Sequence, residues 1–507
     1  MFHKNINHIP NLLLIVSSIL LTLFSDGDSN AESHSFKRIV KEKIIASLDS
    51  STFMPDSFAV SPDGRRMAYV EKIGNKQVVV VDGVRQKVYD EIQFGDYFPL
   101  EFSPDSSKIG FFAREDKRWF FVIDGKEQKE HQPVTTLNPS SNLRFNYSKE
   151  AAHYCYVAKT ADKQYLVVDG KVGSNEYEEI FPCIFSCDGK RIACTVREGK
   201  KLFEVIDGVK QKEYSVIGSL TFSPNGKRFA YMAYPDKAWA QRSQRWLMVI
   251  DGREEKDYWR VWPGYDFFSP DSRRTAYMAD TGTDDMPKPV IVLDGREISD
   301  ESAGLSSPVF SPDSKRIAYM AKVYKKGFMM PSPPPTYDFN VVDGKPGKTY
   351  DRASIPVFSP DSHRLAYYGV IQGKYMMVID NEEGKHYDDI GHPVFSRDSK
   401  RVGYYARQGA DCFIVVDGKE FNAYASFSKP IFSPDSKRIC YFAKKSGKRT
   451  VVIDDIVGQF YDEIYPRNWR KRVADNGIGF SLDDSFYYFA KKGNEIIFVQ
   501  ETIDTAD

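Results

Sequence analysis

A repeated unit with a mean length of 42 residues constrains the fold of this chain more than any other feature of its sequence. The unit is clearest in the segment Phe-Ser-Pro-Asp-Ser-Lys-Arg-Ile-Ala-Tyr-Met-Ala at 310–321, and degenerate forms lie at 147–158 and 480–490. Eleven copies align on a serine, at positions Ser61, Ser103, Ser148, Ser186, Ser223, Ser269, Ser311, Ser359, Ser396, Ser433 and Ser481. A period in this range is typical of repeats that each form one four-stranded sheet.

Each repeat also contains a β-branched run that ends in Asp-Gly, for example Val-Val-Val-Asp-Gly at 79–83. This pattern predicts a tight hairpin turn, because both central residues of such a turn need a positive φ angle. A short polar segment follows, as in Lys-Val-Tyr-Asp-Glu-Ile at 87–92. The repeat therefore predicts four strands, with the sequences Pro-Val-Phe, Lys-Arg-Ile-Ala-Tyr-Met-Ala, Tyr-Met-Val-Val-Ile-Asp and Lys-x-Tyr-Asp-Glu-Ile. In the second strand, isoleucine and tyrosine share one face and alanine lies on the other.

The combination of Ser-Pro-Asp-Ser-Lys-Arg-Ile-Ala-Tyr with a later β-run and Asp-Gly resembles the TolB-type, WD-like β-propeller repeat over about residues 58–500. The resemblance implies an all-β propeller built from about eleven four-stranded blades. Two departures from the usual pattern are a missing tryptophan before Ser-Pro-Asp and the regular second half of the repeat. Propellers of this kind include enzymes, carriers and scaffolds, so the resemblance predicts the fold and not the function.

Eleven blades exceed the roughly four to eight of a typical propeller, so we predict two consecutive propellers, over residues 36–262 and 263–507. The last repeat lacks a fourth strand, which residues 36–46 could supply. Such closure also fits one large closed ring of eleven blades, or a chain path that leaves one ring and returns to it. An open array of blades is a further alternative, although it leaves two sheet edges exposed.

The N-terminus has the pattern of a secretory signal peptide over residues 1–31. A weakly basic start precedes the apolar run Leu12–Phe24, and the polar stretch after it contains the small residues Ser29 and Ala31. Because a membrane-spanning helix needs about 20 apolar residues, this run favours a cleaved signal over an uncleaved anchor. We expect a periplasmic or extracellular chain with no membrane-spanning segment after cleavage.

Charge and motif content argue against several classes of function. Lys+Arg and Asp+Glu both number 70, so the net charge is +0 and no basic excess is available to attract nucleic acid. The chain has no Gly-x-Ser-x-Gly, His-Glu-x-x-His or Gly-x-Gly-x-x-Gly motif, and we expect no catalytic group, cofactor or metal. The alternative is an enzyme acting in the propeller channel, such as a polysaccharide lyase or a hydrolase. Some TolB-like lyases hold a metal by histidine there, and His386 and His392 are the candidates for this role.

The two faces of such a propeller differ in sequence. One face carries the Ser-Pro-Asp and Asp-Gly turns, and we expect the aspartates of the Ser-Pro-Asp turns to cap them rather than bind calcium, because they lie ~40 residues apart. The opposite face carries the loops between the second and third strands. Three consecutive repeats have long loops there, at 234–245, 280–289 and 322–338. Consecutive repeats are neighbours in space, so these loops should form one patch.

Aromatic residues and methionines gather in or beside the long loops, namely Tyr234, Trp239, Trp246, Trp259, Trp262, Phe328, Met329 and Met330. Exposed clusters of this kind commonly anchor a protein or carbohydrate partner. The same residues could instead pack the junction between two rings. On the first interpretation the chain is an exported binding or assembly scaffold for a protein or a cell-envelope glycan.

A second candidate surface is the loop at 465–478, which contains Arg467, Trp469, Arg470, Lys471 and Arg472. This loop could dock an acidic or phosphate-bearing partner, or it could be a solvated basic loop.

The chain has six cysteines, and disulfides can form in an exported protein. Cys183 and Cys194 flank the turn at 187–190 on adjacent strands, so they would be cross-strand partners and a disulfide between them is geometrically possible. Cys155 and Cys440 stand where the repeat has alanine, a position that calls for a small buried residue.

Overall fold

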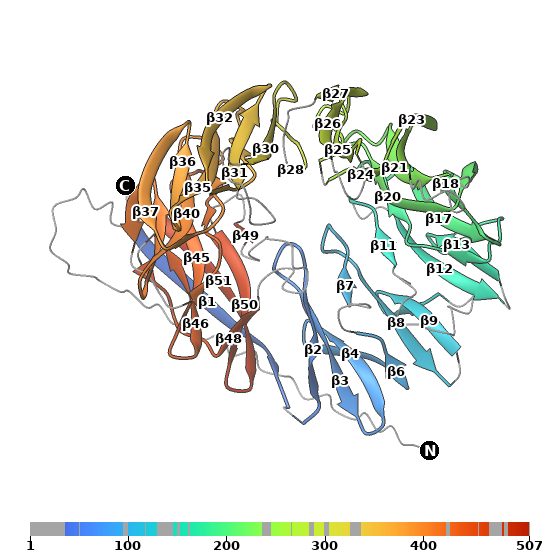
Figure 1. Cartoon of the computed structure of the whole chain (residues 1–507). Helices are drawn as coiled ribbons and strands as arrows, with labels where there is room; N and C mark the ends of the chain where they lie inside the picture. Colours follow the sequence, from blue (N-terminus) through green and yellow to red (C-terminus); the bar gives the residue numbers. More distant parts are fainter. Residues whose placement is uncertain are drawn as a thin grey trace, which may run out of the picture.

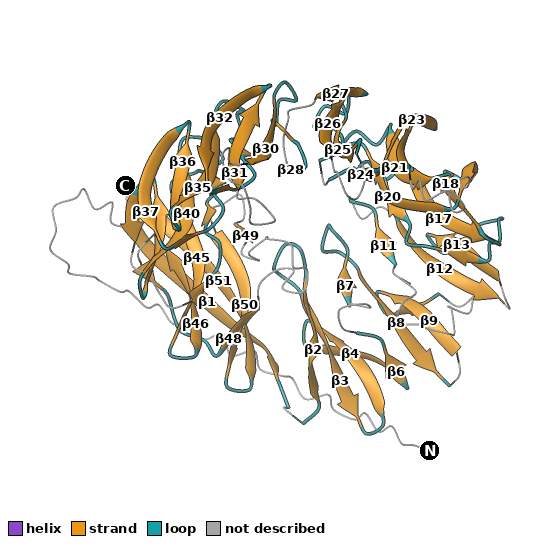
Figure 2. Ribbon diagram, viewed as in Figure 1, coloured by secondary structure: helices purple, strands orange, loops and turns teal. Residues whose placement is uncertain are grey.

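The computed structural model describes residues 36–49, 51–94, 100–116, 118–128, 145–149, 153–160, 163–235, 245–264, 266–282, 288–298, 304–324, 336–421, 426–454, 456–465, 479–480 and 485–505. All regular structure in these residues is β-strand (Figure 2). The strands form eleven sheets that follow one another around a ring (Figure 1). The chain is therefore an eleven-bladed β-propeller, as its repeats predict. Within the described part of the chain, no helix is long and apolar enough to cross a membrane.

The strands of blades one to four are β2 (Phe53–Val60), β3 (Met67–Ile73), β4 (Lys76–Val81), β5 (Val84–Tyr89); β6 (Glu91–Ile92), β7 (Glu101–Phe102), β8 (Ile109–Glu115), β9 (Arg118–Ile123), β10 (Lys126–Glu127); β11 (Asn146–Tyr147), β12 (Tyr154–Thr160), β13 (Lys163–Val168), β14 (Lys171–Val172); β15 (Glu179–Ile180), β16 (Ile184–Phe185), β17 (Ile192–Glu198), β18 (Lys201–Ile206) and β19 (Val209–Tyr214). Those of blades five to seven are β20 (Val216–Phe222), β21 (Phe229–Tyr234), β22 (Trp246–Ile250), β23 (Arg253–Tyr258); β24 (Arg260–Trp262), β25 (Ala276–Asp280), β26 (Pro289–Leu293), β27 (Arg296–Ile298); β28 (Gly304–Leu305), β29 (Val309–Phe310), β30 (Ile317–Tyr324), β31 (Thr336–Val342) and β32 (Lys345–Tyr350).

The strands of blades eight to ten are β33 (Arg352–Ala353), β34 (Val357–Phe358), β35 (Leu365–Ile371), β36 (Lys374–Ile379), β37 (Glu382–Tyr387); β38 (Asp389–Ile390), β39 (Val394–Phe395), β40 (Val402–Gln408), β41 (Asp411–Val416), β42 (Lys419–Phe421); β43 (Ser426–Phe427), β44 (Ile431–Phe432), β45 (Ile439–Lys445), β46 (Lys448–Ile453) and β47 (Ile456–Val457). Blade eleven contains β48 (Glu463–Tyr465), β49 (Gly479–Phe480), β50 (Ser485–Lys492), β51 (Glu495–Thr505) and, from the N-terminal end of the chain, β1 (Phe36–Ser47).

The Asp-Gly turns have the conformation that the sequence predicts. In blade one, Asp82 has φ 51° and Gly83 has φ 83°, and the turn joins the antiparallel strands β4 and β5. The turn aspartates of blades two to ten also have positive φ angles. Aspartate tolerates this conformation better than most residues with a side chain, and glycine adopts it freely.

The predicted fourth strand, Lys-x-Tyr-Asp-Glu-Ile, is wrong in one respect, because this sequence is shared between two blades. Tyr89 ends β5, the outer strand of blade one. Glu91–Ile92 forms β6, which pairs with β8 of blade two through Ile92 and Ala113. The same division follows Tyr387, since β38 pairs with β40 of blade nine. The chain therefore crosses from one blade to the next at Tyr-Asp, and the innermost strand of most blades consists of two short pieces.

The second strand of each blade packs against both neighbours, as its alternation predicts. In blade one, Met67 and Tyr69 belong to the core shared with blade eleven. Ala68 and Val70 belong to the core shared with blade two. The small alanine leaves room for the neighbouring sheet, and a bulky tyrosine fills the other side.

Strand β1 supplies the outer strand that the last repeat lacks. It pairs antiparallel with β51 from Phe36↔Thr505 to Ser47↔Glu495 (Figure 1). Its Glu42 side chain accepts a hydrogen bond from the Tyr461 hydroxyl of blade ten (2.6 Å). Elsewhere an outer-strand glutamate accepts the same bond from the preceding blade, as Glu254 does from Tyr214 (2.8 Å) in blades four and five.

The buried Arg38 side chain fixes β1 at the junction of blades ten and eleven. Its Nε donates to the Glu501 carboxylate of β51, and its Nη atoms donate to the backbone carbonyls of Val451 and Ile456 in blade ten. The Tyr488 hydroxyl donates to the same carboxylate. Glu501 thus has the partners that a buried charge requires.

Consecutive blades share apolar cores around the ring, and blade eleven shares one with blade one through Phe489 and Tyr69. Residue 262, the predicted end of a first propeller, lies within blade six, where Trp262 of β24 pairs with Met278 of β25. The division into two propellers, over residues 36–262 and 263–507, stays a prediction.

Candidate functional site

The Ser-Pro-Asp and Asp-Gly turns of each blade lie together on one face of the ring, which we call the turn face. In blade one, the Asp82 carboxylate accepts hydrogen bonds from Arg66 Nε (2.9 Å) and from the Met67 backbone N–H (2.9 Å). The turn aspartates that accept the same pair of bonds in other blades are Asp207, Asp251, Asp294, Asp343, Asp380 and Asp417. In each of these blades the arginine of one turn binds the aspartate of the other.

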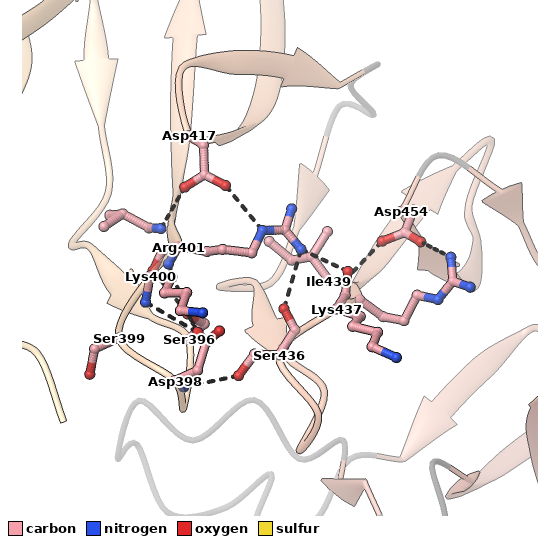
Figure 3. Close-up of polar contacts among 12 residues, drawn as sticks. Ser396, Asp398, Ser399, Lys400, Arg401, Asp417, Ser436, Lys437, Ile439 and Asp454 are labelled. Carbon is pink, nitrogen blue, oxygen red and sulfur yellow. Dashed lines mark hydrogen bonds and ion pairs between the residues drawn. The ribbon is translucent and has the colours of Figure 1, made fainter. Parts of the chain in front are cut away.

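Turn-face contacts also join several blades to the next, as Figure 3 shows for blades nine and ten. The Asp398 backbone N–H donates to Ser436 Oγ of blade ten (3.0 Å). Arg401 Nη1 donates to the Lys437 carbonyl (2.7 Å), and its guanidinium lies over the Phe432 ring at 5.3 Å. Hydrogen bonds and a cation–π contact from one arginine thus join two blades.

The aspartates of the Ser-Pro-Asp turns act as turn caps. Asp398 accepts hydrogen bonds from Ser396 Oγ (2.6 Å) and from the Lys400 backbone N–H (3.1 Å), and these bonds lower the pKa of its carboxyl. Asp271 and Asp313 are held in the same way. The structure confirms the predicted capping role. No group of three or more His, Cys, Asp or Glu side chains among the described residues is arranged to hold a metal ion.

The long loops of blades five to seven begin and end on the opposite face, which we call the loop face. Much of each loop lies outside the described residues, and so do the predicted binding residues Trp239, Phe328, Met329 and Met330. The described ends of the loop in blade six are held by buried Asp280, whose Oδ1 accepts the backbone N–H groups of Gly282 (2.8 Å) and Lys288 (2.7 Å).

Three of the predicted binding aromatics are at least half-buried at the loop face. Tyr234 is 5% exposed, and its ring centre lies 5.3 Å from that of Trp246. Trp246 in turn packs on the core between blades five and six. Trp259 is half-buried, and its backbone N–H donates to the Asp280 carbonyl (2.8 Å). These side chains support the blades from which the loops extend.

Three other aromatic side chains are exposed near the loop face, and we call them the exposed aromatic group. The exposed fractions are 37% for Trp262, 55% for Tyr324 and 38% for Tyr337. No other aromatic side chain is among the large hydrophobic residues exposed in the described part of the chain. Tyr324 ends β30 opposite Thr336, and Tyr337 follows in β31, so the two tyrosines flank the longest loop.

The sequence named Trp262 but missed Tyr324 and Tyr337 as separate candidates. Both tyrosines fall inside the segment at 322–338, the longest of the three long loops. Their positions at the ends of strands were the available signal, because side chains at the mouth of a hairpin loop are the least covered by neighbouring blades.

The remaining candidate groups are separate from this face or outside the described residues. The basic loop with Arg467, Trp469, Arg470, Lys471 and Arg472 lies outside them. His386 lies on the outer strand β37, opposite Met376. His392 lies beside Tyr368, with 5.7 Å between ring centres, and desolvation and the charge of Lys429 lower its pKa.

Four of the six cysteines lie in the cores between blades, namely Cys155, Cys183, Cys194 and Cys440. Cys183 and Cys194 are joined by a disulfide with 4.3 Å between their Cα atoms. Cys155 packs in the same core, where burial raises the pKa of its thiol to about 12. Burial also raises the pKa of Cys440. These two thiols are protonated at neutral pH and therefore unreactive.

Comparison with known proteins adds only distant likenesses. No protein-family model and no curated protein matches the chain. A crystal structure of the eukaryotic initiation factor is 12% identical, covers 87% of this chain and 89% of its own, and has a TM-score of 0.33. TolB from Acinetobacter baumannii is 12% identical over 69% of this chain and 80% of its own, with a TM-score of 0.23. The Dos1 propeller is 10% identical over 72% and 92%, with a TM-score of 0.28.

The chain's own repeats and sheets define its class. It is an eleven-bladed β-propeller protein with a regular turn face and a varied loop face.

Proposed function

We propose that this propeller is an exported, non-catalytic binding scaffold whose loop face at blades five to seven holds a protein or cell-envelope glycan partner. The observation that carries the proposal is the coincidence of the three long loops with the exposed aromatic group, Trp262, Tyr324 and Tyr337. Large exposed aromatic side chains on loops that depart from a regular scaffold are typical of binding surfaces. Trp239, Phe328, Met329 and Met330 belong to the same proposed surface.

Export is supported by the signal-peptide pattern over residues 1–31. The predicted cleavage site precedes Phe36, the first residue of β1, so cleavage there would leave the closing strand intact. We place the working protein in the periplasm or outside the cell.

The test compares exposed side chains on the two faces. The double variant Tyr324→Ser/Tyr337→Ser should lose at least tenfold in affinity for the partner and stay folded, with a modest fall in melting temperature because the side chain of Tyr337 is partly buried. Val84, which is 63% exposed and directly follows the Asp-Gly turn of blade one, offers a matched control on the turn face. Val84→Ser should bind as the wild type does.

Partners would be isolated from the cell envelope with the wild-type chain and titrated against each variant, once as purified protein and once as purified glycan. Saturation by one class and not the other would identify the partner. Equal affinity of the wild type and the double variant for every isolated partner would overturn the proposal.

A further inference from the structure

One position of the repeat distinguishes two of the contacts between neighbouring blades from the rest. It lies on the third strand, three residues before the turn aspartate, and its side chain faces the next blade. Eight of the ten blades with a turn aspartate have an apolar residue there, namely Val79, Phe121, Leu166, Met248, Ile291, Met377, Ile414 and Val451. Blade four has Glu204 and blade seven has Asn340.

Glu204 is fully buried between blades four and five. Its Oε1 accepts a hydrogen bond from Thr195 Oγ1 (2.6 Å), while its Oε2 has no hydrogen-bond partner among the described residues. Burial, and then the charge of Glu204, raise the pKa of the Tyr231 hydroxyl in blade five, which also interacts with Tyr214. A buried polar group without a partner costs free energy, so this interface is weaker than its apolar counterparts.

Asn340 makes the interface between blades seven and eight different in the same way. It is 2% exposed, and neither its amide nitrogen nor its amide oxygen has a hydrogen-bond partner among the described residues. Asp338, two residues earlier on the same face, is also buried. Its Oδ2 accepts the backbone N–H of Ala353 in blade eight (3.1 Å), whereas its Oδ1 lacks a hydrogen bond and lies 3.7 Å from Lys322 Nζ.

The two polar interfaces bound the three blades that carry the long loops. Inside that segment, the equivalent positions in blades five and six are the fully buried Met248 and Ile291. At both boundaries the outer strands remain joined by ion pairs, Lys212–Glu254 (2.8 Å) and Lys348–Glu383 (2.7 Å). The boundaries are thus joined at the outer edge and weakened in the middle.

We infer that blades five to seven form a unit that tilts against the other eight blades, with the interfaces at Glu204 and Asn340 as its hinges. The inference rests on the proposed function in giving the motion a role, since the tilt would move the three long loops together toward or away from a partner. Among titratable groups, Tyr231 interacts with Glu204, and Tyr231 in turn interacts with Tyr214 and Glu254. Lys212 donates to Glu254. Because Lys212 is paired with Glu254, ionisation of Glu204 loosens the first hinge.

Hydrogen–deuterium exchange of the full chain tests this inference. The double variant Glu204→Met/Asn340→Met gives both positions the residue that blades five and eight already have. We expect amide exchange in β18, β21, β31 and β35 to slow at least tenfold relative to wild type. Ile414→Met, an apolar exchange at the same repeat position in blade nine, should leave those rates unchanged. Unchanged rates in the double variant, or equal slowing in all eleven blades, would overturn the inference.

Glu204→Gln covers the case in which the double variant fails to fold. After correction for intrinsic exchange, it should slow exchange in β18 and β21 at pH 8 and have no effect at pH 5.5; equal effects at both pH values would contradict the first hinge. The Tyr324→Ser/Tyr337→Ser variant should leave exchange in β18, β21 and β35 as in the wild type. Failure of the binding test would therefore be distinguishable from failure of the hinges.

Discussion

The turn face and the loop face of this propeller are built from the same strands but show opposite degrees of regularity. On the turn face, an arginine in several blades binds its own turn aspartate and the backbone of the next blade, as Arg401 does with Asp417 and Lys437. On the loop face, blades five to seven depart from the repeat and expose aromatic side chains. The ring thus keeps one set of contacts between blades regular on the turn face, while the loop face of blades five to seven varies.

The largest loss of stability is expected in blade eleven, where a different ion pair replaces the arginine–aspartate pair of the turn face. In blade eleven, Glu501 stands at the place of the turn aspartate and Arg38 of β1 takes the role of the arginine. Arg38→Ala leaves the buried Glu501 without its cation, so we expect a loss of about 3–5 kcal/mol in the free energy of unfolding. Chemical denaturation measures this loss.

Lys43→Ala, an exposed position on the same strand, is the control and should cost little. A loss below 1 kcal/mol for Arg38→Ala would show that ring closure does not depend on this pair.

The next largest effect is the dependence of stability on pH through Glu204, which is buried between blades four and five. Burial raises the pKa of Glu204 from 4.5 to about 7, so the folded chain holds this proton more tightly than the unfolded chain does. Stability is then highest below pH 4.5 with respect to this group, falls by about 3 kcal/mol as pH rises to 7, and stays low above it.

Glu204→Gln should remove that part of the pH dependence and stabilise the chain at pH 8. Denaturation curves of both proteins at pH 5 and pH 8 measure the difference. Parallel pH profiles would contradict a buried, unpaired carboxyl.

A smaller loss of stability is expected when one arginine that joins two blades on the turn face is removed. Arg401→Ala removes the bond to the Lys437 carbonyl and the contact with Phe432, at a cost of about 1–2 kcal/mol because the side chain is partly exposed. Arg364→Ala in blade eight should cost a similar amount, since Arg364 bonds to Lys400 and stacks on Phe395 in the same way. Thermal unfolding of the two variants measures both losses of stability. Clearly unequal losses would contradict the expectation that the two arginines make equivalent contacts.

The smallest change in stability is expected on the loop face. Trp262→Phe should lower the free energy of unfolding by less than about 1 kcal/mol, because Trp262 is 37% exposed and phenylalanine can keep most of the apolar contact of its buried part. Calorimetry checks this value. A loss above about 2 kcal/mol would mean that Trp262 stabilises blade six by packing rather than serving as a contact for a partner.

The repeated parts of the fold were predictable because each depends on local rules. The positive φ angles at Asp-Gly, the capping by Asp398 and the alternation around Tyr69 all follow from short motifs. The shared use of Tyr-Asp-Glu-Ile by two blades was not predictable, because a strand sequence does not show which sheet it joins. The exposure of Tyr324 and the isolation of Glu204 depend on neighbouring blades, which lie far away in the sequence.

We propose that the loop face of blades five to seven contacts the partner and that the turn face does not. A photo-crosslinking residue placed at Tyr324 and, in a separate protein, at Lys437 on the turn face tests this claim directly in intact cells. We predict a discrete high-mass adduct from position 324 and none from position 437. An adduct from position 437 alone, or equal adducts from both positions, would contradict the assignment of the loop face as the binding surface.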